Sequence, residues 1–237
     1  MKSISLISII AFLFFQICNA NSLIRFYQNG KVGYKSTDGK EIVPPIYYAG
    51  SEFENGFAIV MNNNKRGFID ETGKEIISLI YEDVQPFCNG IAPAKFAGKY
   101  GFINTNGQWI VQPIYEEAYK FTEGLSKVKH NGKYGFMNDK GELIVACHYE
   151  QANYFSCGLA SVKSNNLYGF INAKGELVID YKFSQAGCFN PTTKTMQVKI
   201  ENETFEINIQ GEVLKEIEIK HEDEEKREHL HNEKDKD

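Results

Sequence analysis

KYGFINTNGQWIVQPIYEEAYKFTEG, at residues 99–124, is followed by a second version of itself, KYGFMNDKGELIVACHYEQANYFSCG, at residues 133–158. The two stretches are offset by 34 residues, and the same offset relates positions along most of the chain. Self-similarity at a fixed period of this length is typical of tandem repeat proteins. The sequence therefore indicates that one structural unit is repeated along the chain.

Four kinds of position recur in register through five copies of the unit. The first is a glycine, at Gly33, Gly67, Gly101, Gly135 and Gly169. The second is another glycine, at Gly39, Gly73, Gly107, Gly141 and Gly175. The third is an aromatic residue, at Tyr47, Tyr81, Tyr115, Tyr149 and Phe183. The fourth is a phenylalanine, at Phe53, Phe87, Phe121, Phe155 and Phe189. Such regularity predicts five well-formed repeats.

Each repeat translates into three β-strands. Residues 125–130 (LSKVKH) alternate between apolar and polar side chains, as in a half-buried strand. Asn131-Gly132 is a two-residue turn that closes a β-hairpin, because both residues tolerate positive φ. A second strand follows at residues 133–138 and a third at residues 142–146. The unit is thus predicted to be a three-stranded antiparallel meander with a connector of about a dozen residues.

The recurring aromatics and glycines predict how the units pack. The tyrosine and phenylalanine of each connector, such as Tyr115 and Phe121, are expected to point inward. A glycine in the middle of a strand weakens it unless a neighbouring group needs the space. We therefore expect an aromatic ring from a neighbouring element to lie on the backbone at positions such as Gly135. One meander cannot bury both its faces, so successive units must stack to form a continuous core.

The repeats extend beyond the glycines in both directions. Residues 23–28 match the first strand of a unit, and residues 196–219 form a degraded sixth unit, as expected of a terminal cap. The repeat domain is therefore assigned to residues 21–219. The predicted fold class is all-β, with tandem three-stranded meanders in an open, solenoid-like array. The alternative is a closed β-propeller, but many propellers split one blade between the chain ends, and no split unit is present here.

These residues carry a resemblance to a known family. The strings at residues 99–124 and 133–158 resemble the WG-type β repeat of bacterial proteins, over residues 23 to about 215. The tryptophan that precedes the glycine in that family is absent, and its position is held by Val32, Arg66, Tyr100, Tyr134 and Tyr168. The resemblance implies an all-β repeat architecture with an interaction role, and it implies no catalytic residues.

The two ends of the chain differ from the repeat domain. Residues 1–20 have the pattern of a secretory signal peptide, with Lys2, an apolar stretch at 4–17 and small residues before a cut after Ala20. The apolar stretch is shorter than the roughly 20 residues that span a bilayer, so no membrane span is expected. Residues 220–237 are highly charged and predict a disordered tail. The mature protein is expected in the secreted or periplasmic, cell-envelope compartment.

Composition and motifs disfavour several classes of function. The formal net charge of −5 leaves no basic excess for tracking phosphates, so nucleic acid is not an expected partner. We find no nucleophile paired with a base and no phosphate-binding glycine motif, and we predict neither an enzyme nor a cofactor. The best candidate for a metal site combines Cys147, His148 and Cys157, but it lacks the paired ligand spacing of a zinc site, and we assign no metal.

Two aromatic residues that break the repeat pattern are the candidate ligand contacts. Trp109 stands where other repeats have glutamate or leucine, and Tyr119 has no counterpart in the recurring columns. An exposed ring at such a position is a plausible contact anchor. The predicted function is an exported, non-catalytic binding or scaffold module that presents its connector loops to a protein or glycan partner. An envelope-structural spacer is the alternative.

Overall fold

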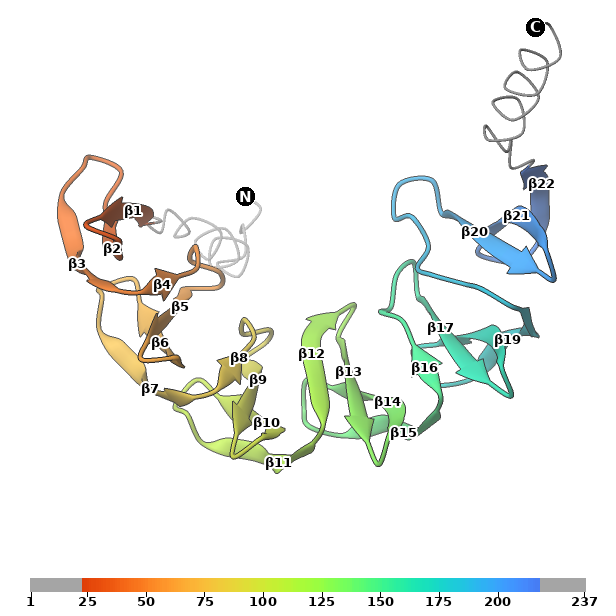
Figure 1. The fold of residues 1–237 in the computed structure, drawn as a ribbon, viewed down its shortest axis with the longest axis horizontal. Coiled ribbons are helices and arrows are strands. Elements are labelled where there is room, and N and C mark those ends of the chain that lie inside the picture. Colours follow the sequence, from red (N-terminus) through yellow and green to blue (C-terminus); the bar gives the residue numbers. More distant parts are fainter. Residues whose placement is uncertain (1–22, 218–237) are drawn as a thin grey trace, which may run out of the picture. The chain divides into compact units, whose positions relative to one another are not determined.

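The computed structural model describes residues 23–217, and every regular element in that range is a β-strand (Figure 1). The chain divides into two compact units, residues 1–147 and 148–237. No helix of the described range is long and apolar enough to cross a membrane. The expected signal peptide and charged tail lie outside the described residues.

The strands form antiparallel sheets that follow one another in chain order. The first sheet contains β1 (Ile24–Gln28), β2 (Lys31–Lys35) and β3 (Glu41–Tyr47). The second contains β4 (Ala49–Gly50), β5 (Phe57–Asn62), β6 (Lys65–Asp70) and β7 (Glu75–Tyr81). The third contains β8 (Asp83–Val84), β9 (Ile91–Phe96), β10 (Lys99–Asn104) and β11 (Trp109–Tyr115). The fourth contains β12 (Glu117–Thr122), β13 (Leu125–His130), β14 (Lys133–Asn138) and β15 (Leu143–Tyr149).

The remaining strands belong to the second unit. The fifth sheet contains β16 (Gln151–Ala152), β17 (Leu159–Ser164), β18 (Leu167–Asn172) and β19 (Leu177–Phe183). The sixth contains β20 (Thr195–Ile200), β21 (Glu203–Asn208) and β22 (Val213–Ile217). Among the described strands, no sheet combines strands from the two ends of the chain. The predicted all-β array of tandem meanders, with no blade shared between its ends, is confirmed.

The structure adds a fourth strand that the sequence did not predict. In the second to fifth sheets, a short part of the connector pairs with the first strand of the next meander, as Asp83 does with Lys95. The pairing satisfies the outer hydrogen-bonding groups of that first strand. The third strand of each sheet, such as β7 or β11, stays at the opposite edge.

Successive sheets stack through apolar faces within each unit, as predicted. Tyr34 of the first sheet packs with Val60 of the second in one buried cluster, and Phe102 of the third packs with Val128 of the fourth in another. In the second unit, Phe170 of the fifth sheet packs with Val198 of the sixth. The first predicted inward column of aromatics is confirmed, because all five of its members are buried: Tyr47, Tyr81, Tyr115, Tyr149 and Phe183. The phenylalanine column is confirmed in part, because Phe87, Phe155 and Phe189 are buried whereas Phe53 and Phe121 are half-buried.

The mid-strand glycines exist for a different reason from the one the sequence suggested. A Cβ atom built on Gly135 would lie 2.4 Å from the carbonyl oxygen of Val145, a backbone atom of the adjacent third strand, and one on Gly67 would lie 2.3 Å from that of Ile77. The expectation that a ring covers the glycine is therefore wrong at Gly135. Rings do lie against three other members of the column: a Cβ atom would lie 2.9 Å from Phe26 at Gly33, 2.7 Å from Trp109 at Gly101 and 3.0 Å from Tyr181 at Gly169, but the backbone of the third strand is nearer at each of them. The third strand bulges over the glycine, so that Arg66 pairs with Tyr81 while Phe68, two residues later, pairs with Ile77. The bulge leaves no room for a side chain.

In the sixth sheet, the third strand does not bulge at this position, and the residue there is not a glycine. Its residue at the glycine position is Phe205, which pairs directly with Glu216 of the third strand. The register there shifts only later, between Glu206 and Ile207. Because the strand does not bulge over this position, a large side chain is accommodated.

Candidate functional site

A polar triad recurs on one face of three successive sheets. Each triad combines an acid or amide of the connector strand, a lysine of the first strand and a tyrosine of the second. Directly opposed residues of neighbouring strands project from the same face, and the strand register places the three side chains of each triad in one row. The triads are Asp83, Lys95 and Tyr100; Glu117, Lys129 and Tyr134; and Gln151, Lys163 and Tyr168.

The tyrosine of each triad contacts the other two members, one through its hydroxyl group and the other through its ring. The Tyr100 hydroxyl donates a hydrogen bond to Asp83 at 2.7 Å, that of Tyr134 to Glu117 at 3.1 Å, and that of Tyr168 to the side chain of Gln151. The lysine ammonium of the same triad lies 5.1–5.6 Å from the centre of the ring, within cation–π range. Burial and the hydrogen bond to Asp83 both raise the pKa of Tyr100.

The triad of the fourth sheet gathers the most interactions around one carboxylate. Glu117 accepts hydrogen bonds from the hydroxyl of Tyr119 at 2.5 Å and from the ammonium of Lys129 at 3.0 Å, in addition to that from Tyr134. Partial burial acts to raise the pKa of Glu117, but these hydrogen bonds outweigh it and hold the pKa below its usual value of 4.5. Glu117 is therefore ionised at neutral pH and fixes the positions of its donors.

An arginine links the triad of the third sheet to the preceding sheet. Arg66 forms an ion pair with Asp83 at 3.0 Å and donates a hydrogen bond to the carbonyl oxygen of Glu82 at 2.6 Å. Asp83 thus accepts from Arg66 of the second sheet and from Tyr100 of its own. The triad of the third sheet is therefore a structural feature that also connects this sheet to the second.

The two candidate contact residues occupy different surroundings. Trp109 is half-buried on β11, with its ring 5.7 Å from that of Tyr81, and it packs in the layer between the second and third sheets. Tyr119 lies on β12, where it donates to Glu117 and its ring lies 4.2 Å from the ammonium of Lys127. Part of each side chain remains accessible, and each has a structural role in addition to any contact with a ligand.

No group of three or more His, Cys, Asp or Glu side chains in residues 23–217 is placed to bind a metal ion. Cys147 is half-buried on β15, whereas the neighbouring His148 is exposed and lies against the ring of Tyr149 at 4.0 Å. Cys88 and Cys147 are free thiols. The thiol groups of Cys157 and Cys188 lie 3.6 Å and 3.4 Å from the carbonyl oxygens of Asn190 and Tyr154.

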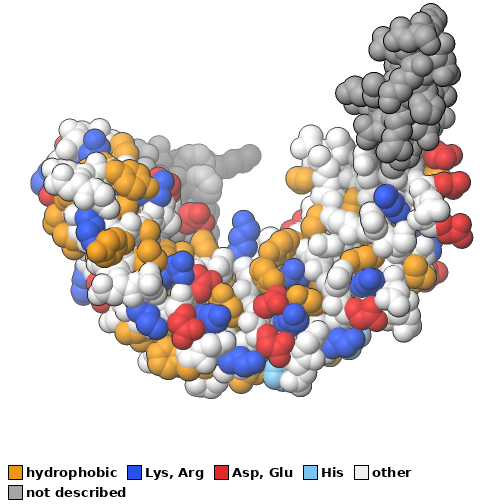
Figure 2. Space-filling model, viewed as in Figure 1, with side chains coloured by type: hydrophobic (Ala, Val, Ile, Leu, Met, Phe, Trp, Pro, Cys, Tyr) orange, Lys and Arg blue, Asp and Glu red, His pale blue; other side chains and the backbone are white. Residues whose placement is uncertain are grey.

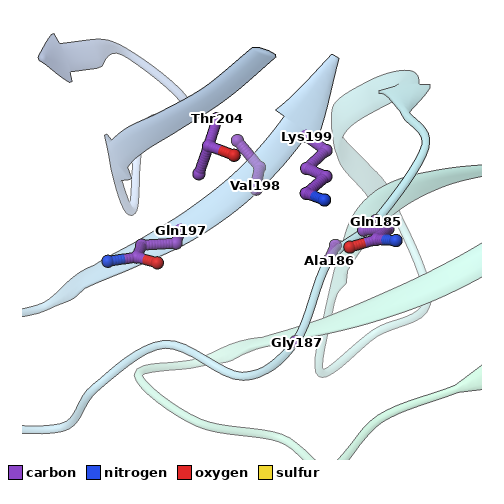
Figure 3. Close-up of a pocket in the computed structure, with 7 residues that line it drawn as sticks. All are labelled: Gln185, Ala186, Gly187, Gln197, Val198, Lys199 and Thr204. Carbon is purple, nitrogen blue, oxygen red and sulfur yellow. The ribbon is translucent and has the colours of Figure 1, made fainter. Parts of the chain in front are cut away.

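Two cavities occur where the second strand has no tyrosine. One, of about 280 Å³, lies on the sixth sheet (Figure 3) and is lined by Gln185, Ala186, Gly187, Gln197, Val198, Lys199 and Thr204. The other, of about 240 Å³, lies at the same repeat position of the second sheet and is lined by Ala49, Gly50, Ser51, Ile59, Val60, Met61, Arg66 and Val84. The tyrosine position is held by Thr204 in the first cavity and by Arg66 in the second. Each cavity therefore lies at a triad position where the tyrosine ring is missing.

The sequence does contain one pattern that corresponds to the triads, in addition to the recurring glycines and aromatics. A lysine recurs at Lys95, Lys129 and Lys163 with the 34-residue period of the repeat, and Lys199 follows 36 residues after Lys163. Its significance depends on pairing with the connector strand, and that strand was not predicted. The triads and the two cavities could therefore be identified only from the structure.

Comparison with known proteins identifies the repeat. A family model described as "WG containing repeat" matches residues 33–65, 67–100, 100–134, 134–168 and 168–190, well over half of the chain. No curated protein matches the sequence.

Several solved structures align with this one, over part of their length. One described as a crystal structure of the eukaryotic initiation factor has a TM-score of 0.54 at 10% identity, and the match covers 84% of this chain and 63% of that one. The chain therefore spans less than two thirds of that protein's length. A structure of Hsv2 from Kluyveromyces lactis has a TM-score of 0.46 at 11% identity, covering 79% and 71%. At such identities the likeness to the first structure shows a shared fold alone.

Proposed function

The chain belongs to the WG-containing β-repeat family, and from this premise we propose that it is an exported, non-catalytic binding module for a protein partner. The observation that carries the proposal is a row of exposed isoleucines on the third strands of the first unit. Ile46 of β3, Ile80 of β7 and Ile114 of β11 stand at the same position of three successive repeats and are 51%, 49% and 46% exposed. Figure 2 shows hydrophobic side chains at the surface of these sheets, interspersed with charged ones.

The regularity of this row distinguishes it from ordinary surface apolar residues. Single exposed hydrophobic residues are normal on soluble proteins, whereas apolar residues that recur at one position of successive repeats offer a partner a repeated set of contacts. The third strands are also sheet edges, which can pair with an extended segment of another chain. Isoleucine offers neither a flat ring nor a hydrogen-bonding group for a sugar, so the row favours a protein partner over a glycan. The connector loops that follow these isoleucines complete the proposed contact surface.

The test is capture of a partner by the purified chain from extract of its own source, with two double variants in parallel. Ile80→Glu with Ile114→Glu places two charges on the isoleucine row and should reduce capture at least about tenfold, since each site loses apolar contact and gains a charge that must be desolvated. Asn106→Glu with Gln108→Glu adds the same two charges at the exposed turn before β11 and should leave capture unchanged.

Equal capture by the wild-type chain and both variants would remove the isoleucine row from the binding surface. The alternative function, an envelope spacer, predicts that no partner is retained specifically by any of the three proteins. The comparison therefore distinguishes a contact surface from a purely structural array.

Export is the second part of the proposal and rests on the N-terminal sequence. If the signal peptide is cleaved after Ala20, the mature chain begins at Asn21. N-terminal sequencing of the protein recovered from outside the cytoplasm should therefore read NSLIRF. Mature protein that retains Met1 in a membrane fraction would contradict cleavage.

A further inference from the structure

The fifth and sixth sheets of the second unit have the same polar site, but the tyrosine ring is present in the fifth sheet and absent from the sixth. In the fifth sheet, the Tyr168 hydroxyl donates to Gln151, and the Lys163 ammonium lies 5.6 Å from the centre of the ring. In the sixth sheet, Gln185 stands at the position of Gln151 and Lys199 at that of Lys163. The acceptor and the cation are therefore both retained.

Only the tyrosine is missing from the sixth sheet. Thr204 pairs with Lys199 at the position that Tyr168 occupies beside Lys163. A threonine side chain ends at its β-carbon substituents, so the volume of the phenol ring is left empty, and the cavity of about 280 Å³ lies at this position. Figure 3 shows Gln185, Lys199 and Thr204 around this cavity, contributed by the connector, β20 and β21.

Thr204 supplies independent evidence that the cavity is incomplete. The residue is only 7% exposed, and its hydroxyl oxygen has no hydrogen-bond partner among the described residues. Buried hydroxyl groups are almost always hydrogen-bonded, because desolvating one without a partner is unfavourable. Thr204 therefore does not complete the site as Tyr168, with its bonded hydroxyl, does in the fifth sheet.

From this geometry we propose that the cavity on the sixth sheet is a socket for a phenol ring supplied by another molecule, as the side chain of a peptide tyrosine or as a free phenol. The ring lies beneath the Lys199 ammonium, and its hydroxyl donates a hydrogen bond to the side-chain carbonyl of Gln185, as Tyr168 does to Gln151. The volume is close to the lower end of the roughly 300–1,000 Å³ typical of ligand pockets, so it suits one ring. The socket lies in the second unit and does not depend on the isoleucine row.

The equivalent cavity of the second sheet does not share this chemistry. Ala49 and Met61 stand where the socket has Gln185 and Lys199, so both the acceptor and the cation are absent. Arg66 is turned toward Asp83 and the carbonyl oxygen of Glu82. The second-sheet cavity therefore serves as an internal reference that should not bind a phenol.

The test is an NMR titration of the full isotope-labelled chain with three probes. N-acetyl-tyrosine amide should give saturable shifts at Gln185, Lys199 and Thr204 and none at Ala49 or Met61. N-acetyl-phenylalanine amide, which lacks the hydroxyl, should bind about tenfold more weakly, since it leaves the Gln185 acceptor unpaired. Binding of 4-methylphenol as tight as that of the tyrosine amide identifies a free phenol as the source, and tighter binding of the amide identifies a peptide.

Variants of the socket complete the test. Thr204→Tyr should place the chain's own ring in the socket, abolish binding of the tyrosine amide and raise the melting temperature. Gln185→Leu should weaken binding about tenfold by removing the acceptor. Gln210→Ala changes an exposed residue of the turn before β22, outside the cavity lining, and should leave affinity unchanged. The proposal is overturned if the tyrosine and phenylalanine amides bind equally, if no probe saturates, or if both Thr204→Tyr and Gln185→Leu bind the tyrosine amide as the wild-type chain does.

Discussion

Replacing Phe87 with alanine should lower the free energy of unfolding by about 3–5 kcal/mol, the range for truncating a fully buried phenylalanine. Phe87 is 3% exposed and lies in the layer between the second and third sheets. Its ring centre is 4.6 Å from that of Phe68 and 5.0 Å from that of Phe57. Alanine would leave a cavity in the buried cluster between these two sheets. Urea denaturation of the wild-type and variant proteins measures the difference.

Phe121→Ala is the matched control, because Phe121 holds the same repeat position in the next layer. Its side chain is half-buried, and its ring centre lies 5.9 Å from that of Phe102. Less apolar surface is lost on truncation, so we expect a distinctly smaller destabilisation than at Phe87. If Phe121→Ala destabilised the protein as much as Phe87→Ala, burial within this column would not determine its contribution to stability.

The features of the fold that could be predicted from the sequence are those that depend on local patterns repeated in each unit. The alternation in residues 125–130 and the turn at Asn131-Gly132 depend on local backbone geometry, and the structure has both, with φ of 50° at Asn131 and 74° at Gly132. The inward column that includes Tyr115 was equally accessible, because a buried position tolerates few residue types. Local patterns of this kind need no knowledge of which strands pair.

Features that depend on pairing between distant residues were missed. The connector strand β8 has only two residues, Asp83 and Val84, too few to show alternation, and it exists because the edge of β9 is available to it. In the same way, the triad around Glu117 cannot be recognised until β12 is paired with the edge of β13. Trp109 illustrates the same limit, since its contact with Tyr81 of the preceding sheet is set by the stacking of the units and not by its own neighbours in the chain.

The repeat glycines carry the second large prediction. Gly135→Ala should destabilise the protein by about 1–3 kcal/mol, as expected for inserting a methyl group into a well-packed site. The added Cβ would lie 2.4 Å from the carbonyl oxygen of Val145 and 2.9 Å from the backbone nitrogen of Cys147. Backbone atoms of a paired strand cannot move aside as a flexible side chain can. At an unobstructed position, the same substitution would instead stabilise by about 0.4–1 kcal/mol through the unfolded chain. Thermal and urea unfolding measure the sign.

Gly132 separates this steric cause from a conformational one. It has a φ of 74° and no atom within 4 Å of a built Cβ, so L-alanine there is strained by its backbone alone. D-alanine, introduced by semisynthesis, favours positive φ and should restore stability at position 132 but not at 135, where φ is not in the left-handed region. Stabilisation by ordinary Gly135→Ala would contradict the collision. The sixth sheet supports it, because Phe205 fills the glycine position where the third strand pairs directly and does not bulge over it. The glycine is therefore required by the bulge of the adjacent strand and not by the strand in which it lies.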